Sequence, residues 1–292
     1  MLAVINIWLD VISTLLALGM VFGFVIPHFI GSILTGRVRK HFVENYWDPL
    51  AHRVHDPENY HYKQPISNDF PPATRVWHWV NLTSFMILLI SGLYIRYPFF
   101  YGARDSFRFV HYIFMWIITI NLIWRLIYFA RVDWRNYLLF DRSDISNAIA
   151  VAKYYIFIGP PYEHRKKFNP LQRPTYPMIW GLLLLQAISG FIIFRPSIVP
   201  GFLSGMAGGP AAFAAFARLF HSTNTRLMVT IATVHAYLGT MEDYPVLALF
   251  WFWREPDLSK YEHEDHGHDD HDTHGGGRDD ETTELPAPPV TS

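Results

Sequence analysis

The sequence contains no cysteine among its 292 residues. The chain therefore forms no disulfide and offers no thiolate to zinc, to an iron–sulfur cluster or to a catalytic reaction. Any redox chemistry must rest on a cofactor that other side chains hold. Histidine, with 15 copies, is the obvious source of such ligands.

Charged residues are also scarce. They make up only 17% of the chain, while hydrophobic residues make up 51%; a soluble domain has about 25% charged residues. The net charge of -1 gives no indication of nucleic-acid binding. Charge is missing from long windows, and an apolar window of about 18 residues or more can cross a bilayer. The composition therefore predicts a membrane protein.

Five apolar spans stand out, and each suits a helix because backbone groups in lipid must be satisfied within the segment. They are Val11 to Gly36, Val76 to Ile95, Phe109 to Ala130, Thr175 to Phe194 and Leu219 to Met241. The first is interpreted as a retained helix, since Asp10 interrupts the apolar stretch and no cleavage pattern follows. The predicted fold class is an all-α integral membrane bundle, with a four-helix core and one extra N-terminal transmembrane helix.

Lysine and arginine in the connections predict the orientation of these helices. Segments 37–75 and 125–173 hold fifteen of them, whereas the other two connections hold five. The first two segments are therefore expected in the cytoplasm, with the N-terminus outside and the C-terminus inside. Of the arginines within spans, Arg125 is expected to reach outward to the interface. Arg226 needs a carboxylate partner or a wet cavity.

Five histidines lie in apolar spans, where a polar residue is costly and invites a functional explanation. Three of them follow the pattern Arg-x-x-His at the start of a span: Arg75 to His78, Arg108 to His111, and Arg218 to His221. Given the helix directions, His78 lies near the cytoplasmic face, while the other two share a depth near the outer face. The fifth, His28, follows Pro27 and is interpreted as a packing or kink residue.

His235 follows His221 by 14 residues, which is nearly four whole turns of a helix. Both side chains therefore project from one face of the helix, roughly 21 Å apart along its axis. In a hydrocarbon core about 30 Å thick, His235 then lies at the level of His78. Two pairs are predicted, His78 with His235 and His111 with His221.

Two histidines on facing helices can occupy both axial positions of a haem iron, which suits electron transfer. Zinc normally takes three or four ligands in one cluster, so two separate pairs favour two haem groups of the b type. Gly92, Gly190 and Gly181 lie near the predicted pairs, either as room for a macrocycle or as ordinary helix contacts. Arg75, Arg108 and Arg218 would bind haem propionates or simply extend to the interface.

These residues resemble the di-haem b-type cytochrome subunits of membrane-bound nickel–iron hydrogenases, formate dehydrogenases and thiosulfate reductases. The likeness covers roughly residues 74–254. It rests on Thr74-Arg75-Val76-Trp77-His78-Trp79, Ser91-Gly92, Arg108-Phe109-Val110-His111, Asn169-Pro170-Leu171-Gln172, Ser189-Gly190, His235-Ala236-Tyr237 and Glu242-Asp243. The last two motifs look most like the hydrogenase branch.

The resemblance implies that His78, His111, His221 and His235 are the four axial ligands. It also implies electron transfer between a periplasmic iron–sulfur and catalytic partner, a hydrogenase first of all, and membrane quinone or menaquinone. The chain is then an electron-transfer subunit rather than a catalyst alone. Phe168 departs from the family, because many hydrogenase subunits have a histidine there. The extra first helix and the linker also lack a counterpart in the common four-helix form.

The chain therefore divides into four predicted parts. These are an N-terminal transmembrane helix (1–36), a cytoplasmic linker (37–73), a di-haem four-helix cytochrome b domain (74–254) and a disordered tail of histidine and acidic residues (255–292). Glu242 and Asp243 oppose the helix dipole where they stand, which suggests a proton relay to quinone. Two alternatives stay open, a metal-ion transporter using the intramembrane histidines and the tail, and a quinone-coupled oxidoreductase that works without a partner.

Overall fold

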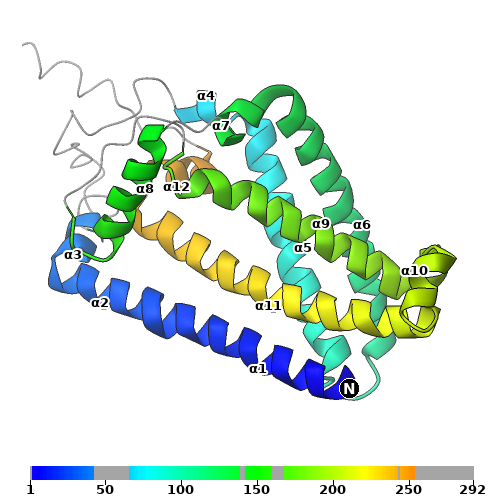
Figure 1. Ribbon diagram of the computed structural model, residues 1–292. Helices are drawn as coiled ribbons and strands as arrows, with labels where there is room; N and C mark the ends of the chain where they lie inside the picture. The colour runs from blue at the N-terminus through cyan, green and yellow to red at the C-terminus, as the bar shows by residue number, and fades with distance from the viewer. Residues whose placement is uncertain (1, 43–65, 139–141, 160–167, 243, 254–292) are drawn as a thin grey trace, which may run out of the picture. The chain divides into compact units, whose positions relative to one another are not determined.

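The computed structural model describes residues 2–42, 66–138, 142–159, 168–242 and 244–253, and every regular element within these ranges is helical. The helices are α1 Leu2–Met20, η1 Val21–Val25, α2 Ile26–Leu34, α3 Arg37–Phe42, α4 Ile66–Asp69, α5 Pro72–Arg96, α6 Arg104–Tyr128, η4 Phe129–Asp133, α7 Trp134–Leu138, α8 Arg142–Tyr155, α9 Gln172–Phe194, η5 Pro196–Ile198, α10 Gly201–Met206, α11 Pro210–Glu242 and α12 Tyr244–Phe252 (Figure 1). The predicted all-α class is confirmed. The tail and most of the linker lie outside the described residues.

Four helical stretches are long and apolar enough to cross a membrane, namely Ile7–Leu34, Pro72–Arg96, Arg104–Asp133 and Gln172–Phe194. The fifth predicted span lies in α11, which has 33 residues and is long enough to cross. Its composition is more polar than that of the other four. Asn224 and Thr225 explain part of this difference, because both side chains bond to Gln186 of α9 rather than facing lipid.

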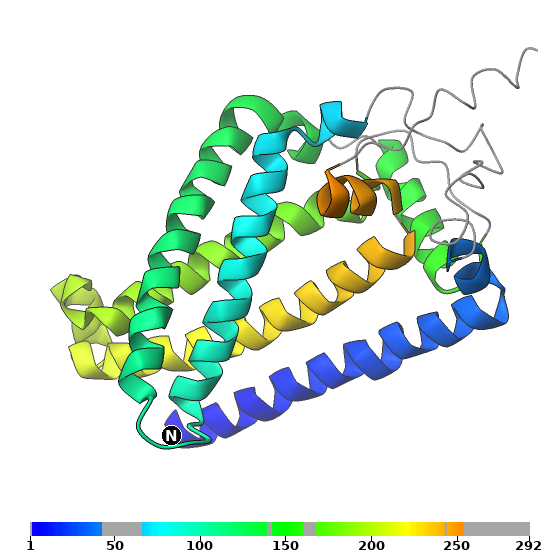
Figure 2. The same cartoon turned by 180° about the vertical axis from the view of Figure 1, so that it is seen from behind.

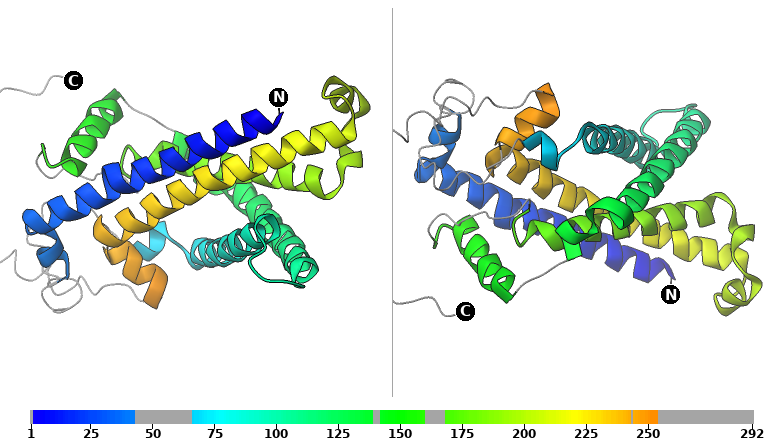
Figure 3. Two further views of the ribbon diagram at one scale, coloured as in Figure 1. Left: turned by 90° about the horizontal axis from the view of Figure 1, so that it is seen from below. Right: turned by 90° about the horizontal axis from the view of Figure 1, so that it is seen from above.

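The core consists of two helix hairpins. Helix α5 packs along α6, and α9 packs along α11, as Figures 1 and 2 show from opposite sides. Pro98 and Gly102 separate α5 from α6, and Gly102 has a φ of +87°, a conformation that favours glycine. The N-terminal stretch α1–η1–α2 lies along α11 (Figure 3). The two hairpins form the four-helix core, and the N-terminal stretch packs against this core as a fifth long helical element.

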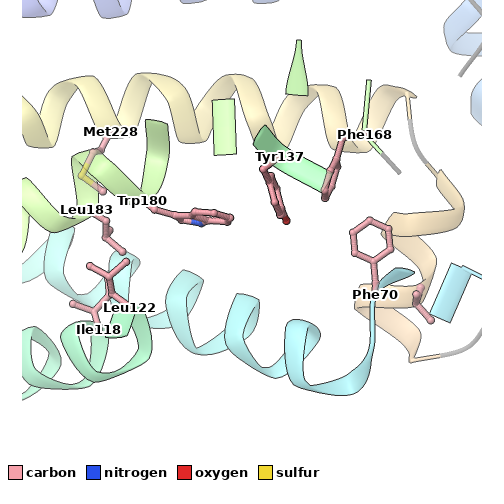
Figure 4. Close-up of a cluster of buried hydrophobic side chains, with 9 residues drawn as sticks. Phe70, Ile118, Leu122, Tyr137, Phe168, Trp180, Leu183 and Met228 are labelled. Carbon is pink, nitrogen blue, oxygen red and sulfur yellow. The ribbon is translucent and has the colours of Figure 1, made fainter. Parts of the chain in front are cut away.

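A cluster of buried side chains joins the hairpins: Phe70, Ile118, Leu122, Tyr137, Phe168, Trp180, Leu183, Met228 and Leu249 (Figure 4). Aromatic rings dominate one end of it, where the ring centroids of Tyr137 and Trp180 lie 4.9 Å apart. Phe168 packs at the same distance from Tyr137 and from Tyr176. The residue that departs from the hydrogenase pattern therefore belongs to the core.

Arg125 does not reach outward, so that prediction is wrong. Its side chain is 3% exposed and donates to the Asp133 carboxylate at 3.0 Å and to the Tyr137 hydroxyl at 2.7 Å. The guanidinium also stacks 4.4 Å from the ring centroid of Trp180. A buried carboxylate and an aromatic enclosure replace the water that the charge would otherwise need. Burial also raises the pKa of the Tyr137 hydroxyl, which stays protonated.

Arg226 has the carboxylate partner that it needs, and that partner lies in the N-terminal helix. The Asp10 carboxylate is 2.6 Å from Arg226 of α11 and 2.9 Å from Arg96 of α5. Further along, His28 is buried and its Nδ1 lies 2.7 Å from the Tyr237 hydroxyl of α11. A π-helical turn, η1, precedes Pro27, whose missing N–H disturbs regular helix bonding. Polar contacts at both ends thus fix this stretch on α11.

Replacing Asp10 with asparagine should loosen the N-terminal helix, since Arg226 and Arg96 then lose their shared counter-charge. We expect the free energy of unfolding to fall by about 2 kcal/mol, measured by thermal unfolding in detergent. Asp105→Asn is the control, because the Asp105 carboxylate is 96% exposed in its pair with Arg108 and should contribute almost nothing. Equal effects of the two variants would contradict this assignment.

Candidate haem sites

His111 of α6 and His221 of α11 are held in the same way by the neighbouring helix. Nδ1 of His111 lies 2.9 Å from the Ser91 hydroxyl of α5, and Nδ1 of His221 lies 2.9 Å from the Ser189 hydroxyl of α9. Each serine also donates to a carbonyl of its own helix, Ile87 at 2.7 Å and Leu185 at 2.9 Å. Each hairpin thus builds one half of a matched pair.

These contacts fix the tautomer of both imidazoles. A serine hydroxyl has one proton, and here that proton is directed to the backbone carbonyl one turn earlier. The oxygen can therefore accept from Nδ1–H of the histidine. Protonation at Nδ1 leaves Nε2 with the lone pair that a metal ion requires.

Glycines beside the two serines allow this close approach. A Cβ at Gly92 would lie 3.3 Å from Cε1 of His111, and a Cβ at Gly190 would lie 3.3 Å from Cε1 of His221. The room left at these two positions is therefore taken by the imidazole rings themselves. At Gly181 a Cβ would meet nothing within 4 Å, so the structure shows no close contact there.

His78 of α5 and His235 of α11 also lie side by side, with ring centroids 6.4 Å apart and an interplanar angle of 55°. An imidazole nitrogen binds a transition metal at about 2.0 Å, so two rings on opposite sides of one ion have centroids roughly 6 Å apart. The observed spacing fits such an arrangement. The side chains present are therefore compatible with a bis-histidine haem at this position.

The surroundings of this pair are aromatic. The Phe250 ring lies 4.9 Å from the ring of His78, and the Tyr176 ring lies 6.1 Å from that of His235. Nδ1 of His78 is buried and has no hydrogen-bond partner among the residues that the structure describes. Within the described part of the chain, neither imidazole of this pair bonds to a serine as the other two do.

The structure brings His78 and His235 side by side, and it holds His111 and His221 through matching serine contacts on neighbouring helices. Among the residues that the structure describes, no group of three or more histidine, aspartate or glutamate side chains could hold a metal ion. The arrangement therefore resembles two two-ligand sites rather than a zinc cluster.

The three arginines of the repeated motif differ in their surroundings. Arg75 is 6% exposed, its guanidinium lies 4.6 Å from the Trp253 ring centroid, and its Nε bonds to no residue in the described ranges. Arg108 is half exposed and pairs with Asp105 at 3.4 Å, and Arg218 is exposed. Only Arg75 of these three thus has a buried donor free to meet an anionic group.

The predicted proton-relay residues lie at the end of α11. Glu242 is the last residue of that helix, and the structure gives no position for its side chain. Asp243 lies outside the described residues. Their role stays a prediction.

The model of one protein family, described as prokaryotic cytochrome b561, matches residues 69–253. The chain belongs to this family. Cytochromes b561 hold b-type haem, so this chain is a multi-pass membrane cytochrome b with an electron-transfer role. The N-terminal stretch α1–η1–α2 precedes the matched region and adds to the family's core.

Two curated relatives of this cytochrome are distant. The chain is 28% identical over 189 residues to "Putative cytochrome YdhU" of Escherichia coli (strain K12), covering 60% of this chain and 72% of that protein. It is 22% identical over 193 residues to "Probable Ni/Fe-hydrogenase B-type cytochrome subunit" of Cupriavidus necator, covering 60% and 79%. No solved structure matches the chain.

The two Ser-Gly motifs belong to the family pattern, but the role of their serines as imidazole partners was not predicted from the sequence. A signal for them exists in the sequence. Arg75 precedes Ser91-Gly92 by the same spacing with which Arg173 precedes Ser189-Gly190. Each hairpin carries one copy of this pattern, followed by Arg-x-x-His on its second helix. Matching positions in two copies indicate matching contacts.

Gly92→Val should displace His111, because the Cβ alone is already close to the ring and valine adds two methyl groups. We expect haem to be held at least about tenfold more weakly at that histidine, as for other disturbed second-shell positions. Haem absorbance per chain of the purified protein measures this. Gly239→Val is the control, since a Cβ there meets nothing within 4 Å. Equal haem content in both variants would argue against the predicted contact.

Proposed function

We propose that this cytochrome carries two b-type haems, one between His78 and His235 and one between His111 and His221. It passes electrons between a periplasmic iron–sulfur partner and membrane quinone. One observation carries the proposal: α11 holds His235 beside His78 and, 14 residues earlier, holds His221 in a serine contact that matches the one of His111. Electrons can therefore cross the bundle between two fixed positions.

The side chains of this protein hold and orient the cofactors. Two histidine ligands would leave a bound haem iron no open position, so the group would supply single-electron exchange without binding a substrate. Ser91 and Ser189 direct Nε2 of their histidines away from α5 and α9. Phe250 and Tyr176 surround the other pair with apolar surface and exclude water. The buried Arg75 is proposed to bind a propionate, and Arg108 and Arg218 do so at the other end.

The partner and the quinone follow from the same arrangement. The lysines and arginines of the connecting segments predict that the N-terminus is outside and the C-terminus in the cytoplasm. The His111–His221 pair is then expected to face the periplasm. A relative named as a hydrogenase subunit supports a hydrogenase as the partner complex, with formate dehydrogenase or thiosulfate reductase next. Quinone reduction consumes two electrons and two protons, and we propose Glu242 and Asp243 as the proton relay beside the His78–His235 pair.

The pairing makes a specific prediction for double variants. His78→Ala should remove one haem, and adding His235→Ala should remove no more, because both changes act on one site. His78→Ala with His111→Ala should remove both haems. Haem content per chain, from the pyridine haemochrome spectrum, distinguishes these cases. His28→Gln is the control, since His28 is bonded to Tyr237 and should leave both haems in place. Additive loss within a pair would refute the assignment.

The proposed proton relay can be tested separately from haem binding. Glu242→Gln removes an ionisable group but preserves size, so quinone turnover should fall by at least about tenfold while haem content stays constant. Activity is measured in membranes that contain the partner complex. Asp105→Asn, at the other end of the bundle, is the control. Unchanged turnover in the Glu242 variant would remove this residue from the mechanism.

A further inference from the structure

The two histidine pairs differ in what their imidazoles bond to. Both rings of the His111–His221 pair donate Nδ1–H to a serine hydroxyl, whereas Nδ1 of His78 is buried and bonds to none of the described residues. We propose that Ser91 and Ser189 are positioning residues that give the His111–His221 site the lower reduction potential of the two. This proposal rests on the proposed function, because it requires a haem at each pair.

A hydrogen bond from Nδ1–H changes the strength of the ligand. As the serine oxygen draws the proton away, electron density on the ring rises and Nε2 becomes a more basic donor. A more basic donor stabilises oxidised iron more than reduced iron, which lowers the reduction potential. Both axial ligands of this site have such a bond, so the two effects act in the same direction.

The His78–His235 site differs in its hydrogen bonds and in its polarity. Within the described ranges, the His78 and His235 rings have no serine acceptor, and their neighbours Phe250 and Tyr176 present aromatic surface. An apolar environment disfavours the additional positive charge of oxidised iron. Weaker donation and lower polarity both raise the reduction potential of the His78–His235 site.

The difference gives electron transfer a preferred direction. With haem held at both pairs, single electrons from a reduced iron–sulfur donor would enter at the His111–His221 site and pass to the His78–His235 site of higher potential. Two such electrons, with two protons, reduce one quinone to quinol at that end. The serine contacts therefore favour transfer from the donor end toward the quinone end.

Redox titration of the haem-loaded full chain, followed by its absorbance, tests the order. With His78 and His235 both replaced by alanine, the remaining site should titrate at the lower of the two wild-type potentials. Ser91→Ala or Ser189→Ala should raise only that lower step, by about tenfold in the equilibrium constant for reduction, or about 59 mV for one electron. Ser84→Ala, a buried serine on the same helix, is the matched control and should shift neither step.

Ser91→Thr retains the hydroxyl and should restore the wild-type potential, or restore haem binding if the alanine variant has lost it. The proposal is overturned if the His111–His221 site titrates above the other, or if the alanine variants keep haem but shift neither step. Wild-type chains that bind no haem under haem-replete expression overturn the proposed function instead. The two failures are therefore distinguishable.

Discussion

An imidazole buried between membrane helices needs a partner for each of its nitrogen atoms to avoid a free-energy cost, because neither lipid nor apolar side chains can supply one. In this protein a serine hydroxyl satisfies Nδ1 of His111 and of His221. That requirement fixes much of the bundle. The serine must face the partner helix of its hairpin, the adjacent residue must be glycine for the ring to approach, and Nε2 must point elsewhere. The packing of each hairpin is thus tied to the chemistry of one ring nitrogen.

The same requirement explains why the N-terminal helix belongs to the core although it lies outside the region matched by the family. Asp10 compensates Arg226, which would otherwise be an isolated cation on α11. His28 finds its partner in the Tyr237 hydroxyl, two residues after His235. A charged and a polar group inside lipid each need a specific counterpart. This helix can therefore dock in one register only, and its removal would leave polar groups of α11 facing lipid.

Periodicity was sufficient for much of this structure. The apolar spans predicted the long helices, and the 14-residue interval predicted that His221 and His235 share a face of α11. Contacts between distant segments were not predictable, because no local pattern links Asp10 to Arg226 or His28 to Tyr237. Arg125 was misplaced because its burial depends on Asp133, which is the last residue of a π-helical turn. Helix α11 begins before the predicted span because an alanine-rich run after Pro210 favours helix without being strongly apolar. The ligand roles of the histidines stay predictions.

The hairpins α5–α6 and α9–α11 carry the same pattern of residues in the same order, and the two pairs of histidines differ in how they fit this repeat. In the first helix of each hairpin, Arg75, His78, Ser91 and Gly92 of α5 match Arg173, Tyr176, Ser189 and Gly190 of α9. In the second helix, Arg108, His111 and Arg125 of α6 match Arg218, His221 and His235 of α11. His111 and His221 occupy equivalent positions, so their surroundings agree. His78 is matched by Tyr176, and His235 by Arg125. The second pair therefore arises where the copies have diverged, and its environment is free to differ from the first. A repeat that conserves one pair and alters the other yields two inequivalent sites within one bundle.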